Sequence, residues 1–146
     1  MAADAYPDSS FLISLHRTDT HHAEAHSFLA RHAASLAFTP LHRIEVRNAL
    51  RNVTAIGEMT EAECRLAFRQ IEEDLRDEIL VHTAIEWTNV FRRAEQLSAD
   101  YAAAAGQRTI DLLHVAIALE SGAKTFLSFD TRQRKLAQAA GLKVKP

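Results

Sequence analysis

The sequence predicts a single α/β domain, with a central parallel sheet of about five strands and helices on both of its faces. Short stretches rich in β-branched and aromatic residues alternate with longer stretches whose apolar residues fall at helical spacing. No internal repeat, low-complexity tract or linker interrupts the 146 residues, which are enough for one domain with its own core. Strands that alternate with helices in this way pair in parallel, because each helix carries the chain back to the start of the next strand.

The first strand and the first two helices are expected near the start of the chain. The stretch "ADAYPD" predicts a short strand that ends near Asp8, and "SFLISLHR" predicts the helix that follows it. In "DTHHAEAHSFLARHA" the apolar residues again fall at helical spacing. Either Asp19 or Thr20 can cap the start of this second helix.

A second strand, "LAFT", and a helical hairpin are expected next. Thr39 followed by Pro40 is typical of a helix start, because the hydroxyl can cap and proline suits the first helical position. This helix is expected to stop at Gly57. The stretch "TEAE" that follows is a capping box, so another helix begins there and runs to about Arg76. Together the two helices predict a hairpin over about residues 40–76.

The second half of the chain continues the alternation. "EILVHT" and "KTFLSF" predict the third and fourth strands, and "LKV" predicts a short fifth strand. Helices are expected over about residues 85–105, from Thr109 to Gly122, and over residues 131–139.

Composition and charge exclude several classes of protein. Seventeen basic and nineteen acidic residues give a net charge of −2, unlike the basic balance of a general nucleic-acid binder. Any positive charge for nucleic acid must therefore be local or come from another chain. The single cysteine, Cys64, has no disulfide partner and favours a reducing compartment. No signal peptide is recognisable and no apolar run approaches the roughly 20 residues of a membrane span, so we expect a cytoplasmic protein.

Four acids are expected at one edge of the predicted sheet. Asp8 closes the first strand, Asp130 closes the fourth, Asp111 lies in the first turn of a helix beside the same edge, and Glu45 lies in the helix after the second strand. Ligands of such sheets bind at the carboxyl ends of the strands. Clustered carboxylates repel one another unless a cation joins them, and Mg²⁺ or Mn²⁺ prefers oxygen ligands. The pattern predicts a site that could cleave a phosphodiester.

Each acid also has a simpler structural interpretation. An Asp in the first turn of a helix or directly after a strand is usually a capping or turn residue. Glu45 is more informative, because it lies at the margin of the apolar residues of its helix, where a carboxylate requires a reason. No single acid favours a metal site. The expected convergence of all four does.

Four stretches resemble the successive motifs of the PIN domain, above all in the VapC-like toxin ribonucleases of prokaryotic toxin–antitoxin pairs. They are "YPDSSFLISL", "TPLHRIEVRNAL", "GQRTIDLLHVAIAL" and "FLSFDTRQRKLAQAAGLKV". The resemblance covers almost the whole chain and includes the order, the spacing and the apolar residues around each acid. The middle, from about residue 58 to 101, matches only in its helical character.

This resemblance implies a PIN-like three-layer α/β/α sandwich whose metal-site acids are Asp8, Glu45, Asp111 and Asp130. The implied activity is a Mg²⁺- or Mn²⁺-dependent endoribonuclease that cleaves structured RNA, either tRNA or rRNA. A metal-activated water would attack the phosphodiester and leave a 5′-phosphate and a 3′-hydroxyl. The implied partners are a VapB-like antitoxin and a second copy of the chain, with the hairpin at about residues 40–76 as a contact region.

The sequence departs from the family pattern next to the acids. Pro7 stands where the family has an apolar strand residue, and a proline is unusual in a central strand because it lacks a ladder donor. It could bend the strand end or move Asp8. Ser128 stands where threonine is commoner. Ser9 and Ser128 both lie where the resemblance implies a small hydroxyl residue near the metal.

Basic residues offer two candidate phosphate-binding surfaces. Arg43, Arg47 and Arg51 form one helical stripe, but it points away from Glu45, so we favour a salt-bridge row or a solvated face. A second group follows Asp130 directly and is better placed to meet RNA phosphates. It consists of Arg132, Arg134 and Lys135.

Three histidines are candidates for other roles. His22 and His26 are spaced to bind a transition metal, but no third ligand is nearby, so a metal site there is disfavoured. His114 lies near Asp111 on the same helix and could hydrogen-bond a carboxylate or a phosphate, although such a histidine is more often a satisfied core residue.

Three alternatives compete with the ribonuclease. The first is a PIN-like module that binds RNA or protein without cutting, against which the intact acids argue. The second is a phosphoacceptor signalling domain, which would need adjacent acids after the first strand, where Ser9 and Ser10 stand. The third is a DNA-cutting nuclease of the same broad superfamily, which the absence of added DNA-binding elements disfavours.

Overall fold

The computed structural model describes residues 2–101 and 106–146, and it has the predicted α/β architecture. Over these residues the strands are β1 (Ala5–Pro7), β2 (Leu36–Phe38), β3 (Leu80–His82), β4 (Thr125–Leu127) and β5 (Lys143–Lys145). The helices are α1 (Ser9–His16), α2 (His22–His32), α3 (Pro40–Ala55), α4 (Glu61–Arg76), α5 (Trp87–Tyr101), α6 (Thr109–Glu120) and α7 (Thr131–Ala139).

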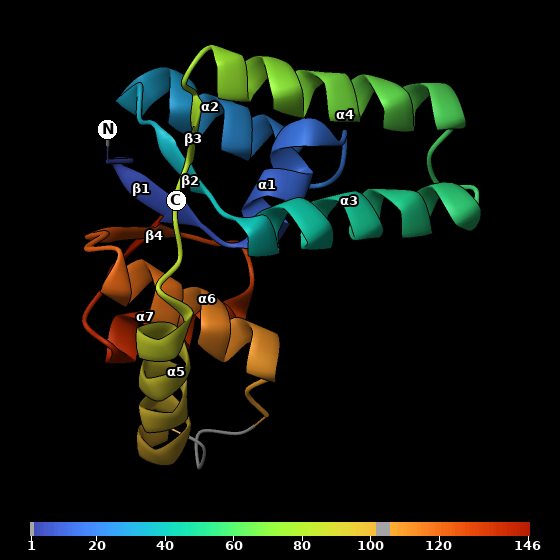
Figure 1. Cartoon of the computed structure of the whole chain (residues 1–146). Helices are drawn as coiled ribbons and strands as arrows, with labels where there is room; N and C mark the ends of the chain where they lie inside the picture. The colour runs from blue at the N-terminus through green and yellow to red at the C-terminus, as the bar shows by residue number, and fades with distance from the viewer. Residues whose placement is uncertain (1, 102–105) are drawn as a thin grey trace.

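The five strands form one parallel sheet in the order β3-β2-β1-β4-β5. Figure 1 labels the first four strands of this order. The chain adds β2 and β3 on one side of β1 and then returns to add β4 and β5 on the other. The strand order therefore switches beside β1, and in such sheets the crevice at the switch point is where ligands bind. The carboxyl end of β1 is Pro7, directly before Asp8.

Helices cover both faces of the sheet, so the fold is the three-layer sandwich that the resemblance implies. Helices α1 to α4 lie on one face and α5 to α7 on the other (Figure 1). The alternation of side chains along β1 shows the same division, since Ala5 belongs to the core of the first layer and Tyr6 to that of the second.

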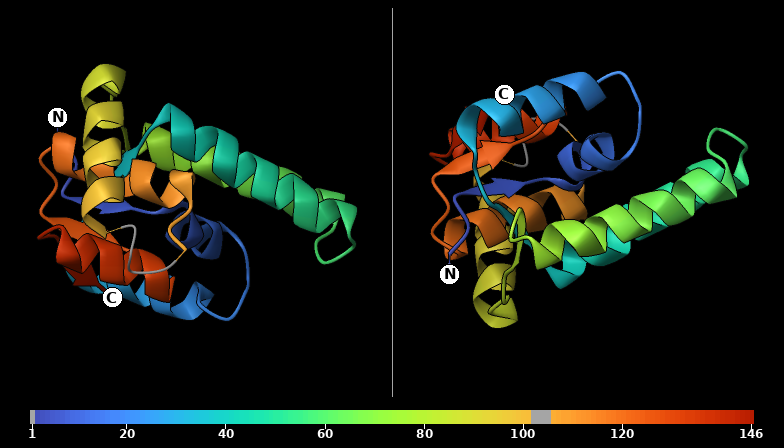
Figure 2. Two further views of the ribbon diagram at one scale, coloured as in Figure 1. Left: turned by 90° about the horizontal axis from the view of Figure 1, so that it is seen from below. Right: turned by 90° about the horizontal axis from the view of Figure 1, so that it is seen from above.

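The hairpin expected at about residues 40–76 is formed by α3 and α4, and it projects beyond the rest of the molecule (Figure 2). Both helices begin with a capping box, in which Thr39 pairs with His42 and Thr60 with Glu63. The first box was not expected, because its third helical residue is a histidine.

The arginine stripe of α3 is a row of intrachain contacts, as the sequence analysis favoured. Arg43 and Arg47 both bind the carboxylate of Glu72 on α4, at 2.8 and 2.7 Å. Arg47 and Arg51 also lie over the ring of Phe68, with 4.7 and 5.0 Å from guanidinium carbon to ring centroid. The stripe holds the hairpin together on the face away from Glu45.

Two element boundaries differ from those expected. Helix α2 begins after His21, and neither Asp19 nor Thr20 caps it. Asp19 instead accepts hydrogen bonds from the Ser14 hydroxyl and the His21 N–H, at 2.9 and 3.0 Å, and so closes the turn before the helix. The expected helix over residues 85–105 begins at Trp87, and its last part, residues 102–105, lies outside the described residues.

Pro7 leaves Asp8 in register with the sheet. In β1 the backbone groups of Ala5 and Pro7 face the β2 side, because Ala5 N–H donates to the Ser35 carbonyl just before β2. The N–H that Pro7 lacks would therefore have pointed to that side. The Pro7 carbonyl points there too, and it accepts a hydrogen bond from His42 Nε2 at 2.7 Å. Asp8 N–H donates to the Leu127 carbonyl of β4 at 2.8 Å, which continues the ladder.

None of the helices within the described residues is both long and apolar enough to span a membrane.

Candidate functional site

Each of the four acids predicted from the sequence begins or lies near the start of a helix at the carboxyl edge of the sheet. Asp8 is the N-cap residue of α1, and Asp130 is the N-cap residue of α7. Asp111 lies in the first turn of α6, and Glu45 lies in the second turn of α3. Helix N-termini carry partial positive charge, which favours anions at this edge.

Asp8 is buried, with 4% of its surface exposed. Its carboxylate accepts hydrogen bonds from Ser10 Oγ at 2.6 Å, from Phe11 N–H at 2.9 Å and from Ser128 Oγ. Burial nevertheless dominates and raises the pKa of Asp8 above its ordinary value, although these hydrogen bonds and the nearby His114 oppose the shift. The carboxylate is thus held in place but is costly to ionise without a cation.

Glu45 is partly buried and is held from both sides. Its Oε1 accepts from Ser9 Oγ at 2.7 Å and from His114 Nε2. Burial acts to raise the pKa of Glu45, but the hydrogen bond and charge of His114 and the Ser9 hydroxyl outweigh it, so the pKa lies below the ordinary value. Glu45 therefore stays ionised near neutral pH, and its position is tied to α6 and to the residue after Asp8.

A buried chain of hydrogen bonds supports Glu45 from behind. A carboxylate can only accept, so His114 Nε2 donates to Glu45, and Nδ1 is hydrogen-bonded to the Tyr6 hydroxyl at 2.7 Å. Burial and the charge of Glu45 raise the pKa of Tyr6 well above its ordinary value, which keeps the phenol protonated as this chain requires. The alternative considered for His114, a carboxylate partner, is the one found.

His42 connects α3 to β1 close to Glu45. It is fully buried, and burial lowers its pKa well below the ordinary value, so the ring is neutral. Nδ1 accepts from Thr39 N–H at 3.0 Å, and Nε2 donates to the Pro7 carbonyl. This single ring fixes the start of the helix that carries Glu45 to the end of the strand that leads to Asp8.

Asp111 and Asp130 lie on the other side of the cluster. Asp130 accepts from Gln133 N–H at 3.0 Å as the cap of α7, and Gln133 Nε2 donates to the Asp111 carbonyl at 3.1 Å, which ties α7 to α6. Asp111 itself binds Arg108, with 3.1 Å between Arg108 Nε and Asp111 Oδ2. The hydrogen bond and charge of Asp111, and then the charges of Asp130 and Glu45, raise the pKa of Arg108.

The donor set suits a hard divalent cation in its chemistry. All four predicted side chains are carboxylates, and Ser9 and Ser128 add hydroxyls beside them. As the side chains stand, no three His, Cys, Asp or Glu residues within residues 2–101 and 106–146 are arranged to hold a metal ion. The carboxylates are turned to hydroxyls, to His114 and to Arg108, so a cation would have to exchange some of these partners.

The two histidines weighed as transition-metal ligands are not part of this cluster. His22 Nδ1 and His26 Nε2 contact the backbone carbonyls of Ser14 and Leu15, both at 2.8 Å, which is a structural role. Beside the cluster, Arg134 Nη1 donates to the Ser128 carbonyl at 2.7 Å.

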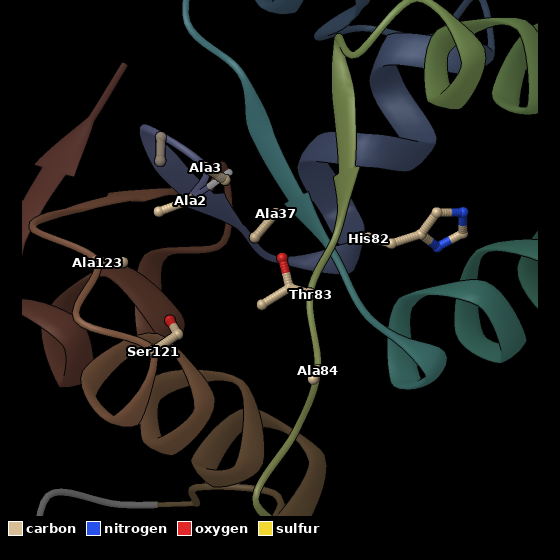
Figure 3. A pocket seen from close by; sticks show the side chains of 9 residues that line it. Ala2, Ala3, Ala37, His82, Thr83, Ala84, Ser121 and Ala123 are labelled. Atoms are coloured by element: carbon tan, nitrogen blue, oxygen red, sulfur yellow. The ribbon is translucent and has the colours of Figure 1, made fainter.

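Two hollows in the part of the chain that the structure describes contain none of the four carboxylates. One of about 190 Å³ is lined mainly by alanines, with His82, Thr83 and Ser121 among them (Figure 3). Another, of about 1030 Å³, lies beside α2 and the end of α4 and is lined by His22, Asp74 and others. The first offers few polar side chains, and the second is separate from the acidic edge.

Sequence reasoning missed Tyr6, His42 and Arg108, which support the acids. Only Arg108 left a signal in the sequence, since it stands three positions before Asp111, within reach of it across one helical turn.

Comparison with protein families gives a match along most of the chain. The family described as the PIN domain matches residues 5–139. Among curated protein sequences, none matches.

Comparison with solved structures finds similar folds over nearly the full length. The Mycobacterium tuberculosis toxin VapC20, described as cleaving the sarcin-ricin loop, is 16% identical, with a TM-score of 0.64 over 97% of this chain and 99% of that one. VapBC2 from Rickettsia felis, bound to a DNA fragment from their promoter, is 10% identical, with a TM-score of 0.67 over 97% and 96%. FitAcB from Neisseria gonorrhoeae is 12% identical, with a TM-score of 0.64 over 97% and 96%. At these identities the likeness concerns the fold.

Proposed function

This chain belongs to the PIN domain family, and from that membership and its acidic cluster we propose that it is the toxin of a toxin–antitoxin pair. In this proposal it is an endoribonuclease that depends on Mg²⁺ or Mn²⁺ and cleaves structured RNA, either tRNA or rRNA, in the cytoplasm. The similar solved structures include a toxin described as cleaving the sarcin-ricin loop, which supports an RNA substrate.

The observation that carries the proposal is the linkage of the four acids at the edge of the sheet. Ser9, next to Asp8, donates to Glu45. Arg108 binds Asp111, and its pKa is raised by the charges of Asp130 and Glu45 as well. Three of the four acids thus act on one guanidinium, and Asp8 is joined to them through its neighbour Ser9 and through Ser128, which helix capping alone does not require.

Asp8, Glu45, Asp111 and Asp130 would hold the divalent cation. When bound, such an ion supplies activation of the attacking water and charge stabilisation of the scissile phosphate. The chain contributes orientation: Ser10 and Ser128 hold the Asp8 carboxylate, and His114 holds that of Glu45. Burial of Asp8 excludes water from one side of the site.

A test of the function is cleavage of total RNA by the purified protein, freed of any co-purifying small partner. We expect a few discrete cuts with 5′-phosphate ends in Mg²⁺ or Mn²⁺, and no cuts in EDTA or with the Asp8→Asn variant. A folded protein that binds metal but cuts none of the RNAs, including tRNA and rRNA added separately, would favour the non-cutting binding module instead.

The support of Glu45 by His114 gives a second expectation. We expect His114→Ala to lower the cleavage rate and the affinity for Mn²⁺ by about 10–100-fold, as removal of a residue that orients a metal ligand typically does. Tyr6→Phe, which removes only the hydroxyl bound to Nδ1, should have a smaller effect in the same direction. Rates and Mn²⁺ titrations equal to those of wild type would show that Glu45 does not depend on this chain of hydrogen bonds.

Partner contacts are proposed on the hairpin. The described residues of α3 and α4 expose Ile44 and Leu66, and Ile56 just after α3 is 70% exposed. Exposed apolar side chains of this size favour a protein contact. We propose that a VapB-like antitoxin or a second copy of this chain binds here, and the similar structures that contain VapBC pairs support the first.

A further inference from the structure

Arg108 stands at a position that ordinary helix rules disfavour. It is the N-cap residue of α6, yet its side chain makes no capping hydrogen bond. Small acceptor side chains are preferred at an N-cap, and a cation is unfavourable at the positive end of the helix dipole. An arginine here therefore requires a reason other than the start of α6.

The backbone of Arg108 is held by the start of α6, whereas its side chain is largely exposed. The Arg108 carbonyl accepts from the N–H groups of Asp111 and Leu112, at 3.0 and 3.1 Å. The side chain is 70% exposed, and within residues 2–101 and 106–146 it is held only by Asp111, through a 3.1 Å contact from Nε and a longer one of 3.5 Å from Nη2. The Asp111 side chain is only 12% exposed, so its charge needs a cation, but the guanidinium lies largely in water and can leave the helix start undisturbed when another cation takes its place.

The guanidinium has the charge that the acidic cluster lacks. Asp111 is its direct partner, and the negative charges of Asp130 and Glu45 also stabilise its protonated form. A monovalent cation beside these carboxylates reduces their mutual repulsion, as a divalent cation would do more strongly. The two cations compete for the same carboxylate, Asp111.

We propose that Arg108 is an internal counter-ion of the acidic cluster, which releases Asp111 to a divalent cation and then binds an RNA phosphate next to the scissile one. The inference rests on the proposed function, and it adds a phosphate-binding residue to it. A guanidinium suits this second role, because it binds phosphate oxygens with two parallel hydrogen bonds. Because the Arg108 guanidinium lies close to Asp111, a phosphate bound to it would lie beside the acids.

The inference predicts opposite effects of one substitution on metal and on RNA. Without a competing positive charge, Arg108→Ala should bind Mn²⁺ about tenfold more tightly than wild type in low salt. Without a phosphate ligand, the same variant should cleave RNA about 100-fold more slowly at saturating Mn²⁺, measured as kcat/KM. A purely structural ion pair would not improve metal binding when it is removed.

Two variants control for charge and for geometry. Arg93→Ala removes one positive charge from α5, where Arg93 pairs with Glu120 at the opposite end of α6, at 2.9 Å. It should bind Mn²⁺ and cleave RNA as wild type does. Arg108→Lys keeps the charge but not the paired donors, so it should bind Mn²⁺ as wild type does and cleave at an intermediate rate.

The experiment combines calorimetric titration of chelator-treated protein with MnCl₂ and cleavage of the RNA identified from total RNA. The inference is overturned if Arg108→Ala matches Arg93→Ala in Mn²⁺ affinity or in cleavage rate. If wild type cleaves no RNA, the proposed function fails together with the phosphate role of Arg108. The Mn²⁺ titration then still decides whether Arg108 is the counter-ion, so the two failures can be told apart.

Discussion

Asp8→Asn is expected to abolish most RNA cleavage and, at the same time, to make the metal-free protein more stable. The rate should fall by at least about 100-fold, because a carboxylate in the proposed metal site is replaced by a neutral amide. The melting temperature in EDTA should rise by about 2–4 °C, which corresponds to about 1 kcal/mol for a domain of this size. Loss of activity would then not be due to loss of the fold.

The stability gain follows from the shifted pKa of Asp8. Burial raises this pKa above 3.8, so folding favours the protonated acid. Protonated Asp8 stabilises the folded protein fully at pH values below the pKa that Asp8 has in the unfolded chain. This stabilisation is lost as the pH rises through the pKa of Asp8 in the folded protein. At neutral pH the wild type therefore carries the cost of a buried charge. Asparagine is neutral at every pH and can still accept from Phe11 N–H, while its amide can donate to Ser128 Oγ.

Thermal melts across pH test this reasoning. The advantage of Asp8→Asn should be largest near neutral pH, shrink as the pH falls through the raised pKa of Asp8, and vanish below about 3.8. Addition of Mn²⁺ should stabilise the wild type and not the variant. If the variant melts below the wild type at neutral pH in EDTA, the charge of Asp8 is not a cost, and the carboxylate is structural.

His42→Ala is expected to destabilise the protein by about 3–4 kcal/mol and to lower its melting temperature by roughly 10 °C. The substitution leaves a cavity at a fully buried position. It also removes the partners of the Pro7 carbonyl and of Thr39 N–H, both in the buried core. Cleavage should fall as well, because α3 would no longer be fixed to the end of β1.

Urea unfolding with two further variants tests this role of His42. His42→Asn can still accept from Thr39 N–H but cannot reach Pro7, so its loss of stability should be smaller. The control is His82→Ala, which truncates an exposed histidine and should change the unfolding free energy by no more than about 0.5 kcal/mol. Equal midpoints for His42→Ala and His82→Ala would show that the ring does not join α3 to β1.

Much of the fold could be predicted because its signals are local. Capping residues such as Thr60 and Glu63, and the alternation of short apolar strands with helices, depend on neighbours in the sequence. The start of α2 was wrong for a related reason. Asp19 can serve either as a cap or as a turn residue. It serves as a turn residue here because it binds the Ser14 hydroxyl, a contact that no local pattern reveals.

The positions of the acids at the ends of strands and the starts of helices could be predicted, but most of the long-range contacts that hold them could not. Positions such as Asp8 and Asp130 follow from strand ends, which a sequence reveals. The support of Glu45 runs through Tyr6 and His114, 108 positions apart, and the compensation for Pro7 comes from His42, 35 positions away. Such contacts depend on packing across the sheet, and an isolated tyrosine or histidine in an apolar stretch gives no sign of its partner.

The pairing of β1 with β4 determines when the fold can be completed during synthesis of the chain. Asp8 and Ser128 are 120 positions apart, yet the Ser128 hydroxyl donates a hydrogen bond to the Asp8 carboxylate. At about 5–20 residues per second, a ribosome needs roughly 6–24 s between the two. During that interval the central strand has only one of its neighbours, and the acidic cluster lacks Asp130. A chain that stops before β4, through a premature stop codon or proteolysis, is therefore expected to lack both the fold and the proposed nuclease activity.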